Sequence, residues 1–537
     1  MKVDNRAFDD LPFSKLFKDY ISGTGNIHAF FQASPTIKGI SDSLNSYRFT
    51  GNREVTHQML SHYNDEFLEN SKVFSQVEAF SNQDTVAIVT GQQTTLFGGP
   101  MFTVLKTITA ICYAKKLQEE TGRTVVPVFW LADEDHDIEE IATVKLPESY
   151  ETKPVTFQHQ DYKNAPPAGS IQLGNELHNV LDVLKKELDQ TDFYDELIST
   201  IEQAYNREST FTEAFGRLMM SMFSRHGLIL AGSLNKDVKK SASILFKHSV
   251  TSAPSLTNAL DNTTYRLKEE GYHDQVQVQS SNLFYVSEGG GRIKIQNTEG
   301  KWNIPGKIWS EKELLDEIDD QPERFSPNVF LRPLLQDRIL PVAGYVGGPG
   351  EIAYYAQMKE FYNELQQPMP AIIPRFSATI FESAIERIIQ KLPFNWAYYI
   401  ERIEDLEKEY VEQSDSADIE KIFGIWRSQI DELSRAKRQE IGEIDPSLKG
   451  SVGKAKATYF SELDKLKGKV YRSVKEQEQV QIDRIRRIKN NLFPNGSLQE
   501  REVGFIYFMN KYGMDIWDTL LDQLHEEDPF SHKEVHL

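Results

Sequence analysis

Short apolar runs alternate with amphipathic stretches over most of the chain. Residues 85–91, TVAIVTG, and residues 124–132, TVVPVFWLA, are apolar runs of the length of a buried strand. Between them, residues 100–122 keep apolar side chains at helical spacing and end at Gly122. A strand, a helix and a second strand within 50 residues form a βαβ unit, and such a crossover predicts parallel strands.

This pattern returns three more times, and each apolar run ends in polar or glycine-rich sequence. The five strand ends carry the sequences TGQQ, ADEDHD, AGSLNKD, VGGPGE and PRFS. Because the carboxyl ends of parallel strands share one edge of a sheet, and ligands bind there, these five segments are expected to line a common cleft. Two stretches of different character, about 145–205 and 255–330, read as insertions. Within the second, residues 272–309 alternate and turn often, which predicts small antiparallel strands with Gly289–Gly291 as a turn.

The chain changes character after about residue 390. Residues 391–495 are rich in charge and carry two long apolar stripes separated by a turn at 445–450, which predicts an antiparallel helical hairpin of coiled-coil type. Arms of about 35 residues would each be roughly 50 Å long. Residues 496–537 are expected to pack near the junction of the core and the hairpin. The predicted stripes are Ile419, Ile422, Trp426, Ile430, Leu433 and Ile441 on the first arm, and Leu463, Leu466, Val470, Val474, Val480, Ile485 and Ile488 on the second.

Composition narrows the class of protein. With 60 Lys and Arg against 80 Asp and Glu, the formal net charge is −20, which argues against general affinity for nucleic acid or an anionic membrane. The sequence has neither an apolar stretch of membrane-spanning length nor a secretory leader, so a cytoplasmic protein is expected. The single cysteine, Cys112, lies in an apolar helical stretch and reads as a buried small side chain rather than a nucleophile.

Two glycine-rich strand ends suggest binding of a small polar molecule. The segment TGQQTTLFGGP has neither the Lys-Ser or Lys-Thr pair of a P-loop nor the dinucleotide fingerprint. It offers backbone amides, two glutamine amides and two hydroxyls before a helix, which suit a carboxylate or phosphate, although a purely structural turn would look the same. In GGPGE, Glu351 could hold a substrate amine or act as a base, or simply complement the helix dipole.

The segment ADEDHDIEE crowds six carboxylates around His136, and like charges at this density repel unless something relieves them. A metal site is one interpretation, but only one histidine is present. In a second, His136 is a general base oriented by a neighbouring acid, or Asp133 and Glu134 bind an amine. In a third, residues 135–140 are a solvated helix start. The arginines of FLRPLL and IIPRFS, Arg332 and Arg375, could hold a substrate carboxylate.

The blocks AIVTGQQTTLFGGPMFTVLKT, PVFWLADEDHDIEEI, RFSPNVFLRPLLQD, GGPGEIAYYAQMK and MPAIIPRF, in this order and followed by a hairpin and FMNKYG, resemble the cysteine-adding enzyme family of bacillithiol biosynthesis. The resemblance covers nearly the whole chain. It implies an α/β fold with a Rossmann-like parallel-sheet core, insertions and an antiparallel coiled coil, in a cytoplasmic homodimer. The implied reaction is a ligation of cysteine to glucosaminyl-malate.

These observations define the expected site. Catalytic roles are expected for His136, Asp135 and Glu351. Substrate binding is expected of Gly91, Gln92, Gln93, Thr94, Asp133, Glu134, Asn328, Arg332, Gly348, Gly350 and Arg375. The family resemblance also allows an adenine nucleotide near Asn510, Lys511 and Tyr512, although no standard ATP motif is present and no metal is expected.

Two other functions remain open at this stage. One is a non-catalytic scaffold that binds partners through its coiled coil, and the other is a metal-dependent hydrolase built on residues 133–137. Polar sequence at five separate strand ends favours a working cleft over a scaffold.

Overall fold

A computed structural model describes residues 1–159, 165–413 and 418–537. The chain divides into two compact units. The first contains residues 1–147, 152–380 and 499–537, and the second contains residues 148–151 and 381–498. Within the described ranges, no helix is long and apolar enough to cross a membrane.

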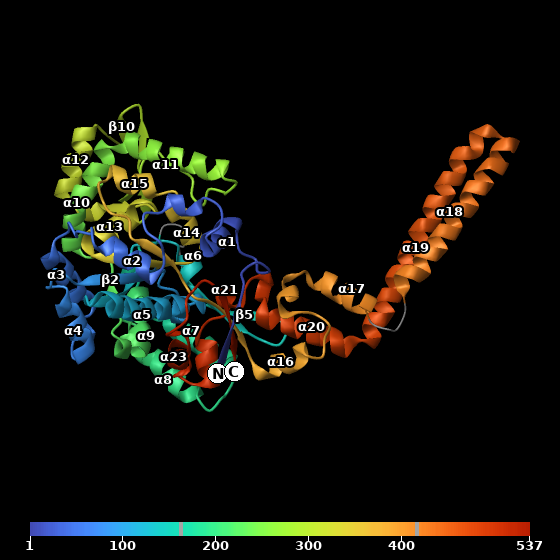
Figure 1. The fold of residues 1–537 in the computed structure, drawn as a ribbon, viewed down its shortest axis with the longest axis horizontal. Helices are drawn as coiled ribbons and strands as arrows, with labels where there is room; N and C mark the ends of the chain where they lie inside the picture. The colour runs from blue at the N-terminus through green and yellow to red at the C-terminus, as the bar shows by residue number, and fades with distance from the viewer. Residues whose placement is uncertain (160–164, 414–417) are drawn as a thin grey trace. The chain divides into compact units, whose positions relative to one another are not determined.

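The first unit is built on a five-stranded sheet with the order β14-β13-β2-β3-β6, in which all neighbours are parallel (Figure 1). The strands are β2 (Val86–Gln92), β3 (Val125–Leu131), β6 (Ile229–Ala231), β13 (Val342–Gly347) and β14 (Ala371–Pro374). The five predicted strands and their parallel direction are therefore confirmed. Because β2 pairs with both β13 and β3, the GQQ end is flanked by GGPGE on one side and ADEDHD on the other.

Helix α5 (Phe102–Thr121) packs on β2 and β3 and is itself covered by α2 (Ile37–Leu44). Burial on nearly all sides explains why its sequence is apolar around most of its circumference. Gly122 adopts a left-handed conformation with φ of 68°, which ends the helix as expected. Cys112 lies in this helix and is buried, and burial raises the pKa of its thiol to about 12.

Both predicted insertions have structure of their own. The first carries the antiparallel pair β4 (Thr143–Pro147) and β5 (Thr152–Thr156), followed by α7 (Glu176–Glu187) and α8 (Tyr194–Ala204). The second forms the antiparallel sheets β12-β7-β8 and β11-β10-β9, and the hairpin from β7 to β8 turns at the expected glycines. Its strands are β7 (Leu283–Val286), β8 (Arg292–Lys294), β9 (Gln296–Thr298), β10 (Lys301–Ile304), β11 (Lys307–Trp309) and β12 (Phe325–Pro327).

The remaining helices of the first unit surround the sheet. They are α1 (Lys15–Ser22), α3 (Arg53–Tyr63), α4 (Ser71–Ala79), α6 (Ile138–Ile141), α9 (Phe211–Phe223), α10 (Lys236–Thr251), α11 (Ala253–Glu269), α12 (Glu311–Asp320), α13 (Leu331–Ile339), α14 (Pro349–Ala356), α15 (Lys359–Glu364), α21 (Gln499–Glu502), α22 (Ile506–Tyr512) and α23 (Ile516–Leu524).

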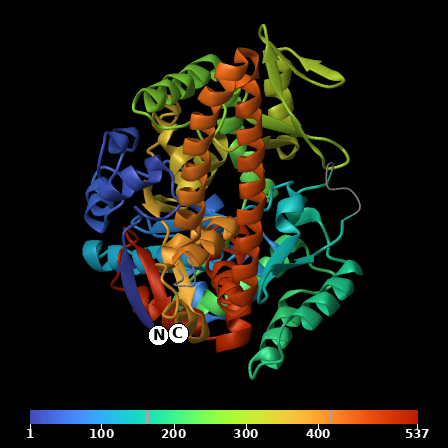
Figure 2. The same cartoon turned by 90° about the vertical axis from the view of Figure 1, so that its right-hand side faces the viewer.

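The second unit contains the expected antiparallel hairpin. Helices α18 (Ile419–Ile444) and α19 (Lys449–Gln477) run side by side over their length in both orthogonal views (Figures 1 and 2). The unit also contains α16 (Ser383–Ile389), α17 (Ile403–Gln413) and α20 (Gln479–Leu492). The arms are shorter than expected, about 40 Å at 1.5 Å per residue, because the second helix ends at Gln477 and α20 starts separately.

The predicted apolar stripes of the hairpin are partly wrong. Ile422, Trp426 and Leu433 on α18 are 53%, 44% and 61% exposed, and Leu466 and Val480 are also exposed. The helices meet instead through a cluster that includes Ile419, Phe423, Leu463 and Val474, with Ile430, Phe460 and Val470 against it. The prediction assigned Ile422 to the seam in place of its neighbour Phe423. The predicted positions Ile419, Ile430, Leu463, Val470 and Val474 are confirmed, whereas Ile422, Trp426, Leu433, Leu466 and Val480 lie outside the contact.

The chain ends return to the first unit. Strand β16 (His532–His536) lies between β1 (Lys2–Arg6) and β15 (Ser377–Phe381), so the two termini lie close together (Figure 1). His532 is fully buried, and its Nδ1 and Nε2 lie 2.9 Å from the hydroxyls of Ser377 and Thr379. Burial lowers the pKa of His532 to about 4, against the opposing effect of Glu500.

We predict that His532 makes the protein sensitive to mild acid. Its folded-state pKa lies below the unfolded value near 6.5, so the unfolded chain binds the extra proton and stability falls as the pH drops from about 6.5 to 4. The contribution is about 3 kcal/mol at the low end of this window. Urea unfolding of wild type and His532→Gln between pH 4 and 8 measures it. The variant should lose less stability on acidification. Equal losses in the two proteins would contradict the assignment.

Candidate functional site

A cavity of about 560 Å³ lies at the carboxyl ends of the parallel strands, entirely within the first unit. The expected residues that line it are Gly91, Gln92, Gln93, Glu134, Asp135, Asn328, Arg332, Gly348, Gly350, Glu351 and Arg375. Lys106, Arg292, Ser233, Ser326, Tyr345, Tyr354 and Arg501 also line it. The structure thus brings together the ends of β2, β3, β6, β13 and β14, as the edge of a parallel sheet predicts.

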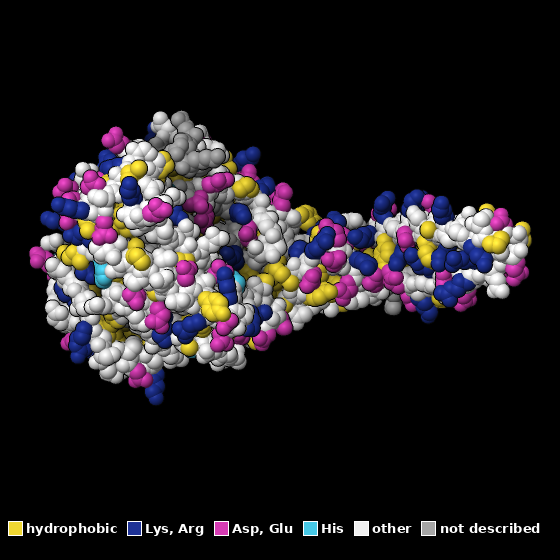
Figure 3. Space-filling model, turned by 90° about the horizontal axis from the view of Figure 1, so that it is seen from above, with side chains coloured by type: hydrophobic (Ala, Val, Ile, Leu, Met, Phe, Trp, Pro, Cys, Tyr) yellow, Lys and Arg dark blue, Asp and Glu magenta, His cyan; other side chains and the backbone are white. Residues whose placement is uncertain are grey.

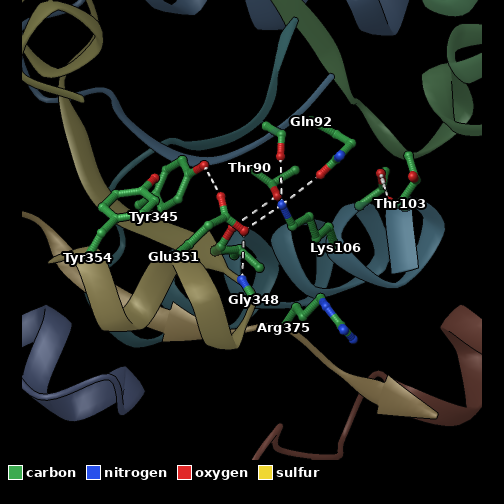
Figure 4. Close-up of polar contacts among 12 residues, drawn as sticks. Thr90, Gln92, Thr103, Lys106, Tyr345, Gly348, Glu351, Tyr354 and Arg375 are labelled. Carbon is green, nitrogen blue, oxygen red and sulfur yellow. Dashed lines mark hydrogen bonds and ion pairs between the residues drawn. The ribbon is translucent and has the colours of Figure 1, made fainter. Parts of the chain in front are cut away.

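The floor of this cavity contains a buried ion pair between Lys106 of α5 and Glu351 of α14 (Figure 4). The ammonium of Lys106 lies 2.5 Å from Glu351 Oε2 and donates to the carbonyl of Gly91 at 2.9 Å and to Gln92 Oε1 at 3.0 Å. Three acceptors match the three donors of the ammonium group. Lys106 is therefore fully occupied by the protein.

Glu351 is equally occupied. Its Oε2 accepts the backbone N–H of Gly348 at 2.8 Å in addition to Lys106, and its Oε1 accepts the hydroxyl of Tyr345 at 2.6 Å. Burial alone would raise the pKa of Glu351, but Lys106, Gly348 and Tyr345 outweigh it and hold the pKa below its usual value. The amine that Glu351 binds in this structure is internal, and a carboxylate with a lowered pKa and filled acceptor sites is a weak base.

The first half of the acidic segment is divided between the interior and the cavity. Asp133 is buried and does not line the cavity. It accepts the backbone N–H groups of Ser233 and Leu234 at 3.2 and 3.0 Å and the hydroxyl of Tyr63. Burial, together with neighbouring Glu134, raises the pKa of Asp133 to about 6. Glu134 does line the cavity, and its Oε2 lies 2.5 Å from the buried ammonium of Lys239.

The second half is organised around Asp135. Its Oδ1 accepts the backbone N–H of His136 at 2.7 Å, and its Oδ2 accepts the side-chain amide of Gln93 at 2.6 Å. The same amide donates to Glu140 at 2.9 Å. Asp133, Glu134 and Asp135 each accept hydrogen bonds from the protein, and Asp135 and Glu140 share the Gln93 amide, which offsets part of their repulsion. Within the described ranges, no three His, Cys, Asp or Glu side chains gather in a way that could hold a metal ion.

His136 lies beside the cavity but does not line it. Its Nδ1 is 2.8 Å from the carbonyl oxygen of Glu134 and its Nε2 is 3.0 Å from that of Gly290, in the turn of the second insertion. Burial lowers the pKa of the imidazole, against the opposing effect of the Gly290 carbonyl. Both ring nitrogens therefore face backbone carbonyls, and the side chain connects the end of β3 to the β7–β8 hairpin.

The arginines differ in what they contact. Arg375 is buried and donates to Glu500 at 2.7 Å and to the carbonyl of Phe376 at 2.8 Å. Arg332 donates to Gln336 Oε1 at 3.1 Å and to the Tyr354 hydroxyl at 3.5 Å. Among the residues that the structure describes, no carboxylate oxygen lies within 4.0 Å of the Arg332 guanidinium. It therefore has no direct counter-ion in the protein.

The other expected residues have structural contacts. Asn328 caps the start of α13 by accepting the N–H groups of Phe330 and Leu331 at 3.0 Å. Thr94 is buried against Thr212 and does not line the cavity. The segment 510–512 lies in α22, away from the cavity lining. There Asn510 donates to the carbonyl of Asp189 at 3.0 Å and Lys511 donates to Tyr507 at 3.0 Å.

Sequence reasoning missed four cationic residues of this region, namely Lys106, Lys239, Arg292 and Arg501. A signal existed for Lys106, because a lone lysine within the apolar stretch FTVLKTITAIC of a helix buried on all sides must have a partner. Arg292 follows the glycine turn of an insertion and Arg501 lies far along the chain, and neither position carries a local signal.

We predict that the Lys106–Glu351 pair stabilises the first unit only as a pair. Lys106→Met leaves the partly exposed Glu351 carboxylate without its cation and should cost about 1–3 kcal/mol of unfolding free energy. The double variant Lys106→Met/Glu351→Gln removes both charges and should recover most of this loss. Urea unfolding measures both, with Lys115→Met, an exposed lysine of the same helix, as the control. A cost below about 1 kcal/mol for Lys106→Met would contradict the pairing.

Comparison with known proteins places the chain in one family. Residues 1–376 match the family described as bacillithiol biosynthesis BshC, N-terminal Rossmann-like domain, and residues 378–537 match its C-terminal coiled-coil domain. A protein of Salinibacter ruber with the name "Putative cysteine ligase BshC" is 31% identical over 97% of this chain and 96% of its own length. Proteins of the same name from Koribacter versatilis and Bacillus anthracis are 29% and 28% identical, over 95% and 97% of each chain. The resemblance found in the sequence is confirmed, and the chain belongs to the BshC family of bacillithiol biosynthesis.

Proposed function

We propose that this chain is a ligase that joins cysteine to glucosaminyl-malate and that the cavity at the strand ends is its active site. The family and the names of its relatives support a cysteine ligase. The observation that supports the assignment of the site is a set of three guanidiniums, those of Arg292, Arg332 and Arg501, that line the cavity without a carboxylate partner among the described residues. Of these, Arg332 is held from behind by Gln336. Both substrates bear carboxylates. An unpaired guanidinium binds a carboxylate through two parallel N–H···O hydrogen bonds.

The charge balance of the cavity supports the same substrates. Five cationic side chains line it, namely Lys106, Arg292, Arg332, Arg375 and Arg501, against the three acids Glu134, Asp135 and Glu351. An excess of positive charge in a protein of net charge −20 favours an anionic ligand at this place. Lys106 also fixes the side chain of Gln92 through its oxygen, so that the Gln92 amide N–H groups are available to a ligand.

Amide formation makes a C–N bond and breaks a C–O bond of the substrate carboxyl. The oxygen must leave on a co-substrate that activates the carboxyl, such as a nucleoside triphosphate, and the proton that the amine loses needs an acceptor. We assign the carboxylate side of the substrates to Arg332, Gln92 and the nearby Arg375. We assign the amine side to Asp135, which lines the cavity with a carboxylate held by Gln93 and backbone amides. We assign the proton acceptor to Asp135, because its hydrogen-bond donors are neutral, whereas Glu351 and Glu134 are paired with the cations of Lys106 and Lys239.

A second proposal concerns assembly. We infer that the chain forms a homodimer in which α18 supplies part of the contact. Ile422, Ile425, Trp426 and Leu433 are exposed at helical spacing on this arm, and hydrophobic side chains interrupt its charged surface (Figure 3). Exposed apolar stripes of this kind are typical of surfaces covered by a partner.

We predict that Arg332→Gln abolishes the function in cells while leaving the fold intact. In a strain that lacks its own gene for this step, the wild-type chain should restore bacillithiol. Arg332→Gln should lower it at least about tenfold, with glucosaminyl-malate accumulating, because a charged contact is lost. Arg332→Lys keeps the positive charge but cannot form the two parallel hydrogen bonds of a guanidinium. Its bacillithiol level should therefore lie between those of wild type and Arg332→Gln. Thiol profiling measures this, with the exposed Arg48→Gln as the control. Normal bacillithiol with Arg332→Gln would exclude this role of Arg332.

We predict that Trp426→Glu combined with Leu433→Glu yields a monomer. The two charges would be buried in the proposed contact, whereas the hairpin seam does not contain these side chains. Light scattering coupled to size exclusion measures the mass. Ser428→Glu with Gln439→Glu adds the same charge to exposed positions of the same helix and should leave the dimer intact. A wild-type protein that is monomeric at micromolar concentration would refute the proposal.

A further inference from the structure

Behind Arg332, helix α13 carries a chain of three hydrogen-bonded side chains that leads away from the cavity. The guanidinium of Arg332 donates to Gln336 Oε1 at 3.1 Å, and Gln336 Nε2 donates to Asp337 Oδ1 at 3.0 Å. Gln336 and Asp337 are buried, and neither lines the cavity. The chain therefore links a residue on the cavity wall to a carboxylate in the interior.

The chemistry of the two ends fixes the amide in the middle. A guanidinium can only donate hydrogen bonds and an ionised carboxylate can only accept them. The Gln336 oxygen must then face Arg332 and its nitrogen must face Asp337, and the reversed amide would break both contacts. The ionised Asp337 thus determines which end of Gln336 is presented to Arg332.

Asp337 has few other partners. Its Oδ2 accepts the hydroxyl of Tyr362, on α15, at 2.6 Å. No cationic nitrogen lies within 4.0 Å of it among the described residues. The ionisable groups that face it are Arg332 on its own helix, Tyr362 on α15, Tyr355 on α14 and Tyr47 in the segment between α2 and α3. Burial raises the pKa of Asp337 to about 7, against the opposing effects of Tyr362, Gln336 and Arg332.

We propose that Asp337 is a positioning residue that acts through Gln336 to hold Arg332 in the orientation that binds the substrate carboxylate. The proposal rests on the function proposed above. It adds that the negative charge opposite Arg332 is the Asp337 carboxylate, which is separated from the guanidinium by the side-chain amide of Gln336. A carboxylate in direct contact would neutralise the guanidinium and compete with the ligand, whereas Asp337 orients it and leaves its outward N–H groups available.

This arrangement couples ligand binding to the ionisation of one buried group. When Asp337 takes up a proton, its hydroxyl can donate to Gln336, and the amide is no longer held with its oxygen towards Arg332. Only the ionised fraction of the protein then binds with full affinity. With half-ionisation near pH 7, lowering the pH from 8 to 6 should weaken binding by about tenfold.

Titration calorimetry of the full-length protein with glucosaminyl-malate tests the proposal. Asp337→Asn should weaken binding at pH 8 by about tenfold and should remove the protein's part of the pH dependence between pH 8 and 6. The substrate's own titration is common to both proteins, so the difference between their profiles is the quantity to compare. Asp337→Asn with wild-type affinity and a wild-type pH profile would overturn the proposal.

Thermal melting of the same variant distinguishes positioning from a structural role. Because the folded-state pKa of Asp337 lies above its unfolded value, ionisation of this group disfavours the folded state above about pH 4. Asp337→Asn should therefore melt at the same or a higher temperature than wild type at pH 8, while binding more weakly. Weaker binding accompanied by a lower melting temperature would count against the proposal, because loss of structure would then explain it.

A second variant keeps the test decisive if Asp337→Asn does not fold. Tyr362→Phe removes a hydrogen bond to the ionised carboxylate, so it should raise the pKa of Asp337 and move the midpoint of the binding profile to higher pH. An unmoved midpoint would overturn the proposal.

The result for Arg332→Gln distinguishes a failure of the proposed carboxylate site from a failure of the positioning role of Asp337. If Arg332→Gln abolishes binding of glucosaminyl-malate while the Asp337 and Tyr362 variants match wild type, the proposed site stands and the positioning role fails. If Arg332→Gln itself binds like wild type, the assignment of the carboxylate site fails, and the positioning role fails with it.

Discussion

The buried ion pair between Lys106 and Glu351 is the contact on which the rest of the site depends. Removing both charges from water is costly, and their attraction offsets this only when the remaining donors and acceptors are also satisfied. In this structure the remaining donors and acceptors of the pair are satisfied by Gly91, Gln92, Gly348 and Tyr345. The pair therefore joins the ends of the adjacent strands β2 and β13 to the starts of α5 and α14, and fixes both glycine-rich turns against each other.

With these turns fixed, the charges of the cavity fall into two groups. Glu134 and Glu351 face buried lysines, and Arg375 faces Glu500, so these residues set the shape of the wall. Among the described residues, Arg332, Arg292 and Arg501 line the cavity without such a carboxylate partner, and we propose that Arg332 binds the substrate carboxylate. The net charge of the whole protein would repel an anion. A local excess of cationic side chains in the cavity can still attract an anion to that place. The same division is compatible with an acidic segment beside the proposed carboxylate-binding site.

The sequence was sufficient to predict the five parallel strands and the edge where they end, because strand length, helical period and polar exits are local properties. It could not give the strand order, which depends on pairing across hundreds of residues. Nor could it tell which carboxylates point into the cavity: Asp133 and Asp135 are two residues apart, yet one is buried against Tyr63 and the other lines the site. His136 was predicted to be catalytic because it is the one histidine within the acidic segment. Its contact with the carbonyl of Gly290 could not be predicted, because Gly290 belongs to a hairpin that is distant in sequence. In the coiled-coil hairpin, the sequence could not decide between Ile422 and Phe423, because both follow Ile419 at a spacing of three or four, and only Phe423 is in the contact.

The last part of the chain shows that domains defined by sequence and compact units need not coincide. The coiled-coil family domain spans residues 378–537, whereas residues 499–537 pack with the Rossmann-like unit. This segment supplies Glu500, which holds Arg375, and Arg501, which lines the cavity. Contacts of such high sequence separation require the closing of a long loop, which costs conformational entropy. The cavity wall is therefore complete only after the segment that follows the hairpin has folded back onto the sheet. The arginine contacts of the site thus depend on the tertiary structure of the whole first unit rather than on the strand ends alone.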